Sequence, residues 1–153
     1  MTDVFADRLA SHGRLDRRPA QVLADAAARH AHWLLRGGLA AVFLYHGIGK
    51  FPTLGGFAAM MGLPLPVAFL VAAGEVGIGL LILAAGALPG RWGDLGTRVA
   101  GAGVVPIMVG AIALVHWPRW SFTPAEGFPM GGMEFQVVLL LTGLWFALRG
   151  NRG

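Results

Sequence analysis

The sequence predicts an all-α integral membrane protein that forms a four-helix bundle. Of its 153 residues, 56% are hydrophobic and 13% are charged, whereas a typical soluble domain has about 25% charged residues. Its 24 glycines suit the close helix contacts found in bilayers. The apolar residues also gather in four long runs, each about the length that crosses a bilayer core. A soluble fold of this size could not easily bury so much apolar surface.

Residues 1–31 precede the first apolar run and are polar and rich in alanine. Pro19 is typical of the first turn of a helix, and Val22 and Leu23 would give that helix a weak apolar stripe. We expect either a short amphipathic helix on the membrane surface or a loose tail, with docking to a partner as a further option. The predicted organisation is a cytoplasmic N-terminal segment, 1–31, followed by a membrane domain, 32–150.

The first predicted span covers residues 33–51, which at about 1.5 Å per residue can cross a bilayer core of about 30 Å. Arg36 lies near its start, where a long cationic side chain can reach the interface, and Pro52 ends it. The short apolar segment 52–64 is either a connector on the membrane surface or an adaptable lip over a binding pocket, since methionine suits pliable surfaces. The side chains assigned to this lip are Phe57, Met60 and Met61.

The second predicted span, residues 65–88, contains one ionisable residue. Glu75 lies about ten residues from its start, roughly 15 Å into the bilayer, where a carboxylate is costly and usually functional. Ala73 and Gly77 are small residues four positions apart, which would let a neighbouring helix approach closely. Residues 89–98 are predicted to form a polar turn after this span.

The third and fourth predicted spans, residues 99–117 and 131–148, each carry an ionisable residue near one end. Pro106 lies in the middle of the third span and should kink it, because proline cannot donate the backbone hydrogen bond. His116 lies at the end of that span, and Glu134 lies at the start of the next. Because consecutive spans run in opposite directions, both residues are expected near the same membrane surface.

The distribution of cationic residues predicts the orientation of the four spans. Four spans place both termini on one side, and that side would carry ten of the twelve Lys and Arg residues. Only Lys50 and Arg119 would lie on the other side. Because cytoplasmic loops are enriched in Lys and Arg, we expect both termini in the cytoplasm. The ten residues are Arg8, Arg14, Arg17, Arg18, Arg29, Arg36, Arg91, Arg98, Arg149 and Arg152.

The ionisable residues within or at the ends of the spans are predicted to meet in one pocket in the outer half of the membrane. They are His46, Lys50, Glu75, His116 and Glu134. His46 and Lys50 are four residues apart and therefore share one helix face. An isolated charge in an apolar medium is unfavourable by several kcal/mol. We therefore expect Lys50 to pair with Glu134 and His46 to hydrogen-bond to Glu75.

Simpler structural roles also fit members of this set. Glu134 would complement the dipole of its own helix, and Lys50 would anchor its helix at the interface. His116 would be an ordinary interface histidine. Glu75 is the hardest to explain in this way, because its side chain cannot reach a membrane surface.

A pocket of this kind suits the head group of a quinone, which needs hydrogen-bond donors at its carbonyls, an apolar slot and a route for protons. In this hypothesis His46 and Glu75 are the catalytic residues, with Glu75 taking a proton and His46 and Lys50 donating to the ring. His116 and Glu134 complete the binding site. The apolar slot is assigned to Phe51, Phe57, Met60 and Met61.

Other functions are left open by the same residues. His46 and His116 could ligate a b-type haem, but their different depths argue against it. Glu75 could instead carry protons or a small solute, or the polar set could simply hold together a scaffold. The absence of cysteine excludes iron–sulfur clusters and Cys-ligated zinc, and no metal is expected. Nucleic-acid binding is not expected either, because no basic stripe is interleaved with aromatics.

Five short stretches carry a resemblance to a known family. In chain order they are Arg36–Leu39, Phe43–Phe51, Gly56–Pro64, Ala73–Gly79 and Gly131–Glu134, all within residues 33–149. Together they resemble the DoxX family of small bacterial membrane proteins. The resemblance implies a four-helix membrane bundle in which the His, Lys and two Glu positions are family features. DoxX relatives are similar to the membrane subunit of thiosulfate:quinone oxidoreductase, and others are linked to membrane-associated oxidoreductase complexes in oxidative-stress defence.

The function expected from these observations is that of a DoxX-like protein of the bacterial inner membrane, a quinone-linked subunit of an oxidoreductase system. Whether the chain is itself catalytic stays open, and nothing marks it as the thiosulfate enzyme, since it has no cysteine to carry sulfur. The alternatives are a non-enzymatic scaffold or assembly partner and a small proton-coupled transporter. The expected partners are the lipid bilayer and other oxidoreductase subunits, and a homo-oligomer is compatible with the sequence.

Overall fold

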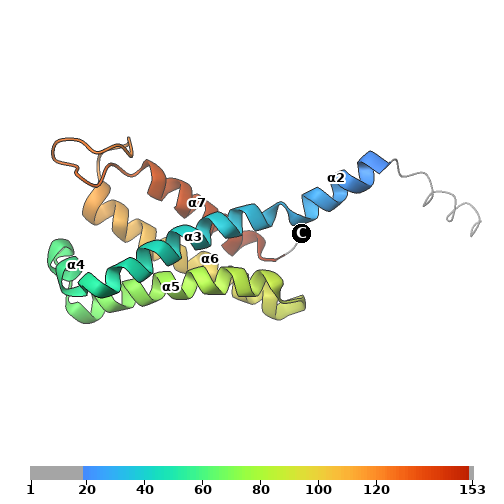
Figure 1. Ribbon diagram of the computed structural model, residues 1–153, viewed down its shortest axis with the longest axis horizontal. Helices are drawn as coiled ribbons and strands as arrows, with labels where there is room; N and C mark the ends of the chain where they lie inside the picture. Colours follow the sequence, from blue (N-terminus) through green and yellow to red (C-terminus); the bar gives the residue numbers. More distant parts are fainter. Residues whose placement is uncertain (1–18, 152–153) are drawn as a thin grey trace, which may run out of the picture. The chain divides into compact units, whose positions relative to one another are not determined.

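The computed structural model describes residues 19–151, which divide into two compact units between His32 and Trp33 (Figure 1). In the first unit, α2 (Pro19–His30) is a helix with no buried residue. Its last residue, His30, donates from Nδ1 to the carbonyl of Ala26 over 2.8 Å. The helix begins at the proline that the sequence places in its first turn. The part of the predicted N-terminal segment that precedes Pro19 lies outside the described residues.

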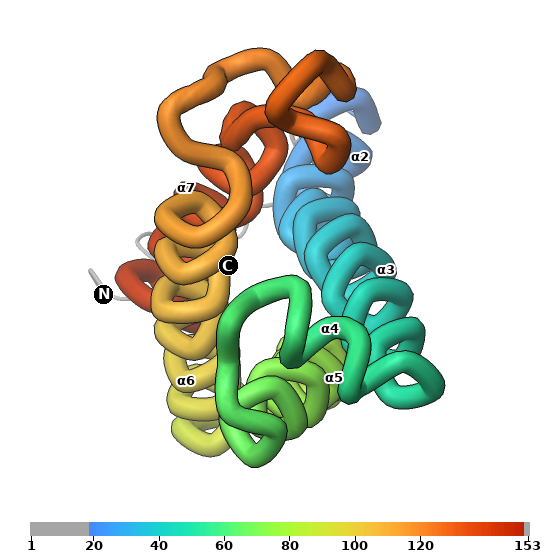
Figure 2. The backbone as a smooth tube through the Cα atoms, turned by 90° about the vertical axis from the view of Figure 1, so that its left-hand side faces the viewer, coloured from blue at the N-terminus to red at the C-terminus, as the bar shows by residue number. Residues whose placement is uncertain are grey.

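Every regular element described in the second unit is helical. Figure 1 shows α4 at the same end of this unit as the loop between η2 and α7, and in Figure 2 both lie toward the viewer. Helix α6 packs against both α5 and α7. In chain order the elements are α3 (His32–Lys50), the 3₁₀ turn η1 (Phe51–Thr53), α4 (Leu54–Met61), α5 (Leu65–Ala87), α6 (Gly90–Ala111), the π-helical turn η2 (Ile112–His116) and α7 (Glu134–Arg149).

One apolar core joins four of these helices. Leu39 and Phe43 enter it from α3, Ile82 from α5, Val104 from α6 and Phe146 from α7, and all five side chains are almost completely buried. Burial of a side chain of this size stabilises a fold by about 1.5–3 kcal/mol. The shared core therefore fixes the part of each helix that lies beside the site described below.

Two helical segments are long and apolar enough to cross a membrane, Leu65–Ala87 and Gly90–His116. They correspond to the second and third predicted spans. The other two predicted spans correspond to α3 and α7. Helix α3 has 19 residues but includes Arg36 and Lys50. Helix α7 has 16 residues and is therefore about 24 Å long, shorter than a bilayer core of about 30 Å.

The polar turn predicted after α5 is wrong over most of its length, because α6 begins at Gly90. Its polar side chains are used inside the fold. Arg98 Nε donates to Asp94 one turn earlier over 2.9 Å, and Arg98 Nη1 donates to the carbonyls of Ala147 and Leu148 over 3.0 and 2.7 Å. The last carbonyls of a helix have no partner within it, so Arg98 caps the end of α7.

Close approach of α3 to α5 depends on two glycines. A Cβ added at Gly47 would lie 2.9 Å from both Glu75 Cβ and the backbone nitrogen of Val76, and one added at Gly79 would lie 2.8 Å from Leu44 Cγ. The sequence pointed instead to the small pair containing Gly77, where an added Cβ would meet nothing within 4 Å. The close contact therefore depends on one glycine from each helix, Gly47 of α3 and Gly79 of α5, and not on two small residues of α5.

The expectation that Arg36 reaches the membrane interface is wrong, because its side chain is completely buried. Nη1 donates to the carbonyl of Ile82 over 2.6 Å, and Nη2 donates to Thr97 Oγ1 over 3.1 Å and to Asn151 Oδ1 over 2.8 Å. The guanidinium also lies 4.8 Å from the centre of the Phe146 ring. These acceptors keep the cation inside the fold and tie α3 to α5, to α6 and to Asn151, two residues after the end of α7.

Candidate functional site

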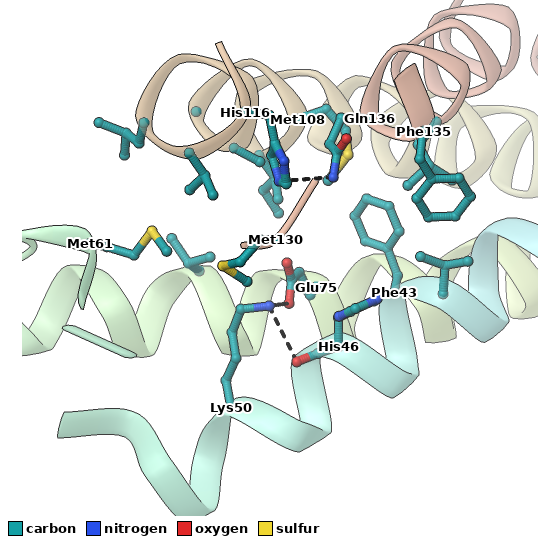
Figure 3. Close-up of a pocket in the computed structure, with 18 of the residues that line it drawn as sticks. Phe43, His46, Lys50, Met61, Glu75, Met108, His116, Met130, Phe135 and Gln136 are labelled. Carbon is teal, nitrogen blue, oxygen red and sulfur yellow. Dashed lines mark hydrogen bonds and ion pairs between the residues drawn. The ribbon is translucent and has the colours of Figure 1, made fainter. Parts of the chain in front are cut away.

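A cavity of about 500 Å³ lies among the helices of the second unit. One side is formed by α3, α4 and α5, and the other by α6, η2, the loop after it and α7. Most of the lining is apolar, and Figure 3 shows its polar side chains in two groups that face each other across the cavity. One group is Lys50 with Glu75, and the other is His116 with Gln136. Pockets of this size and composition are typical of small-molecule sites.

The first polar group is an ion pair between α3 and α5. Lys50 Nζ donates to Glu75 Oε2 over 2.5 Å, and only 7% of the Glu75 side chain is exposed. The same Nζ donates to the carbonyl of His46 over 3.3 Å and lies 5.2 Å from the centre of the Phe57 ring. The pair forms because the glycine contact described above brings α3 onto α5 one turn before Lys50.

The expected pairing of Lys50 with Glu134 is wrong. Glu134 is the first residue of α7, and its Oε2 accepts from the backbone N–H of Phe122 over 3.2 Å. It is not among the residues that line the cavity. The carboxylate therefore holds the loop that precedes its helix, because that loop folds back and brings an unpaired backbone N–H to the start of α7.

His46 lines the cavity but is exposed at its edge. Its ring packs edge-on against Tyr45, with ring centres 5.3 Å apart. The hydrogen bond expected between His46 and Glu75 is replaced by the ion pair between Glu75 and Lys50. Figure 3 shows the His46 ring on the same wall of the cavity as this pair. His46 therefore still lies in one pocket with Lys50 and Glu75, as predicted.

The apolar lip predicted from α4 is present in part. Phe57 and Met61 line the cavity, whereas Met60 does not and is 59% exposed. Residues four apart share one face of a helix, which brings Phe57 and Met61 to the cavity together. Phe51, also predicted to line the slot, lies outside the cavity and packs edge-on against Phe69.

The second polar group is a hydrogen-bonded chain built around buried His116. Its Nδ1 lies 2.9 Å from the carbonyl of Gly131, and its Nε2 lies 2.9 Å from Gln136 Nε2. A carbonyl can only accept, so Nδ1 carries a proton and donates to Gly131, while Nε2 faces the Gln136 amide. His116 is the last residue of the π-helical turn η2, a local structure often found at functional sites.

Gln136 is the site residue that the sequence analysis missed, because that search considered ionisable side chains only. A weak signal was available, since Gln136 is an amide within the fourth apolar run, two residues after Glu134. The structure thus brings together four of the five predicted ionisable residues and adds this amide. Among residues 19–151, no group of three or more His, Asp and Glu side chains is placed to hold a metal ion.

Comparisons with known proteins extend this description. A family model described as DoxX matches residues 31–117, a stretch that includes His46, Lys50, Glu75 and His116. The chain is also 33% identical over 122 residues to "Putative oxidoreductase CatD" of Bacillus subtilis (strain 168), and the match covers 78% of each chain. No solved structure matches the chain.

Proposed function

This chain belongs to the DoxX family, and from that premise we propose that it is a quinone-linked membrane subunit of an oxidoreductase system. The name of the Bacillus subtilis relative supports the oxidoreductase part of the proposal. The quinone part is supported by one observation above all. A largely buried lysine–glutamate pair, in which Glu75 is buried and Lys50 is partly exposed, faces an apolar cavity large enough for a substituted ring.

The ion pair suits a ring that exchanges protons. The ammonium of Lys50 has three N–H donors, and two of them are used by Glu75 and by the carbonyl of His46. The third is available to a ring oxygen. Glu75 is then the acceptor for a proton, with His46 at the cavity edge linking the pair to the outside.

The rest of the lining suits the apolar parts of such a ligand. Phe57 and Met61 from α4 and Phe43 from α3 border the space next to the ion pair. Aromatic and thioether side chains accommodate flat rings without a fixed shape requirement. His116 and Gln136 lie opposite and provide the polar contact at the far edge of the ring (Figure 3).

The proposed setting is the bacterial inner membrane, crossed four times. In this arrangement α3 and α7 span together with the two long apolar helices α5 and α6, and both termini are cytoplasmic. The charge distribution supports this orientation, with ten of twelve Lys and Arg residues on the terminal side. The cavity then opens in the outer half of the membrane. Other oxidoreductase subunits are the proposed partners, because a chain without cysteine needs a bound cofactor or a partner for a redox role.

Quinone content tests the proposal directly. The full-length protein is purified in mild detergent from cells that contain native quinone, extracted with organic solvent, and its quinone is measured per protein. We expect a substantial fraction of one quinone per chain, falling several-fold in Glu75→Gln. The matched control is Glu126→Gln, which makes the same chemical change in the exposed loop outside the cavity. Equal quinone in wild type, Glu75→Gln and Glu126→Gln would contradict the proposal.

A further inference from the structure

Helices α5 and α6 separate toward the end of the unit that carries α4. A Cβ added at Gly103 would lie 2.9 Å from Ile78 Cδ1, and one added at Gly74, nearer that end, would lie 3.6 Å from Ile107 Cδ1. These contacts advance equally along the two antiparallel helices, so the next one should involve Gly110. A Cβ added at Gly110 would meet nothing within 4 Å. The close packing of α5 on α6 therefore ends between Ile107 and Gly110.

The space left by this separation belongs to the cavity. Val71 of α5, Gly110 of α6 and Leu114 of η2 all line it. Leu114 is also 60% exposed, and Pro106, another lining residue of α6, is exposed as well. Side chains that border both the cavity and the outside mark the place where the cavity reaches the surface. The cavity therefore opens sideways between α5 and α6.

Two departures from regular α-helix lie on either side of this opening. Pro106 has no backbone N–H to donate within α6. In η2 the N–H of Trp117 donates to the carbonyl of Ile112 over 2.9 Å, which is the longer hydrogen-bond step of a π-helical turn. Gly110, between them, has no side chain to fill the gap. The sequence of α6 thus favours an opening here over continued packing against α5.

The opening begins one helical turn from the ion pair. Val71 and Glu75 are four residues apart on α5 and share one helix face, and both line the cavity. Met61 of α4 lines it too, and Figure 3 shows this side chain in the space between the two walls, to one side of the pair. A head group held at Lys50 and Glu75 would therefore have an apolar path to the outside.

Two other seams beside the cavity are closed by direct contacts. Helix α3 lies against α5, where a Cβ added at Gly47 would come within 2.9 Å of the backbone nitrogen of Val76. On the opposite wall His116 Nε2 lies 2.9 Å from Gln136 Nε2, which holds η2 against α7. Neither seam has the open space found at Gly110.

We propose that the opening between α5 and α6 is a lateral portal for the hydrocarbon tail of the ligand, whose head group lies at Lys50 and Glu75. The inference rests on the proposed function and specifies its substrate class, a long-tailed quinone that enters from the lipid and not a small ring that arrives from water. The two segments beside the portal are those long and apolar enough to cross a membrane. In a bilayer the portal then faces acyl chains.

The role of the portal is steric. A tail gains little by leaving lipid for an apolar channel, because lipid tails are as apolar as the side chains of that channel. The tail must nevertheless leave the cavity somewhere while the head group stays at the ion pair. A portal at Gly110 allows both at once, so a side chain placed there should exclude ligands with a tail and accept rings without one.

The test compares a quinone with a tail and one without. Full-length protein in lipid nanodiscs is titrated with duroquinone and with a benzoquinone that carries a decyl chain. Bound quinone is measured as the excess over empty nanodiscs of the same lipid, which removes partition into the bilayer. We expect Gly110→Leu to bind the decyl quinone about tenfold more weakly, because the tail must push aside a branched side chain as in an overpacked core. Its affinity for duroquinone should be unchanged.

The matched control is Gly77→Leu, which makes the same change on α5. A Cβ added at Gly77 also meets nothing within 4 Å, but Gly77 does not line the cavity, so both affinities should stay at the wild-type level. Full binding of the decyl quinone by Gly110→Leu, or an equal loss in Gly77→Leu, overturns the inference and leaves the proposed function intact. If the wild-type protein retains neither quinone, the proposed function itself fails.

Photolabelling of the wild-type protein gives a second readout that needs no variant. A decyl benzoquinone with a diazirine in its chain is irradiated in the nanodiscs, and the labelled residues are identified by mass spectrometry. We expect label at Val71 or within residues 110–114. This result decides the question if Gly110→Leu does not fold in a thermal melt or loses both quinones. Label confined to α3 or α7 overturns the inference. So does label at the portal from a diazirine phospholipid and not from the quinone, which would assign the opening to a lipid acyl chain.

Discussion

Arg36 Nη2 donates to Asn151 Oδ1 over 2.8 Å, although the two residues are 115 positions apart in the sequence. Asn151 Nδ2 donates in turn to the carbonyls of Ala85 and Leu88 over 3.2 and 3.1 Å. Asn151, two residues after the end of α7, thus contacts both a buried cation and the carbonyl end of α5. This polar network stabilises one end of the unit, and the candidate ligand cavity is formed by other residues.

The first prediction concerns this network. Asn151→Ala removes one acceptor from the buried guanidinium and one donor from each of two carbonyls, so we expect a loss of about 1–3 kcal/mol of stability. Thermal melting in detergent measures the loss. The control is Thr142→Val, which removes a hydrogen bond that Thr142 makes to the carbonyl of Val138 within its own helix. Equal melting temperatures for the two variants would show that the Asn151 contacts add nothing.

The second prediction concerns the approach of α3 to α5. Gly47→Ala places a Cβ 2.9 Å from the backbone of Val76, which cannot move aside as a flexible side chain could. We expect a cost of about 1–3 kcal/mol, together with weaker quinone binding because Lys50 is displaced from Glu75.

Gly49 provides the matched control, on the same helix two residues later. A Cβ added there meets nothing within 4 Å, and alanine favours a helix over glycine by about 1 kcal/mol. Gly49→Ala should therefore be neutral or slightly stabilising in the same melting experiment. The packing argument would be refuted if Gly47→Ala had the same melting temperature as Gly49→Ala and kept its quinone.

Several features of the helices and of the site follow from the sequence, because they depend on the spacing of residues along a helix and on the length of the apolar runs. The four-residue spacing of His46 and Lys50 places both side chains on one helix face, and Glu75 stands out as an isolated carboxylate within an apolar run. The helix beginning at Pro19 and the second span were likewise confirmed as helices with the predicted starts. These features are local, so no knowledge of tertiary contacts was needed.

The remaining features depend on contacts between distant parts of the chain. Whether Lys50 pairs with Glu75 or Glu134 is decided by the loop that gives Glu134 a backbone N–H to bind. Arg36 could be buried only because acceptors arrive from α5, α6 and Asn151. Sequence patterns do not contain this information, since a cation near a helix end is equally consistent with an interface position.

The third prediction tests the coupling between Lys50 and Glu75. Removing one partner of a buried ion pair costs about 3 kcal/mol, because the other charge is left unpaired, whereas replacing both can be nearly neutral. We expect Lys50→Met and Glu75→Leu each to lower the melting temperature strongly, and the double variant to recover part of the loss. Additive effects would mean that the two side chains do not stabilise each other. The double variant should also lack quinone. It would then recover stability without recovering quinone binding, which distinguishes the two roles of the pair.

The last prediction concerns the orientation in the membrane, and the absence of cysteine makes it clean to test. Single cysteines are introduced at Glu126, in the loop between η2 and α7, and at Arg91, near the start of α6. Both positions are exposed, so neither change should disturb the core. With both termini cytoplasmic, a membrane-impermeant maleimide added to intact spheroplasts should label Glu126→Cys and spare Arg91→Cys, and permeabilisation should expose both. The reverse pattern would place the cavity in the inner half of the membrane. Equal labelling of both positions in sealed cells would show that they lie on the same side of the membrane. That result would contradict the four-span proposal, in which one span separates them.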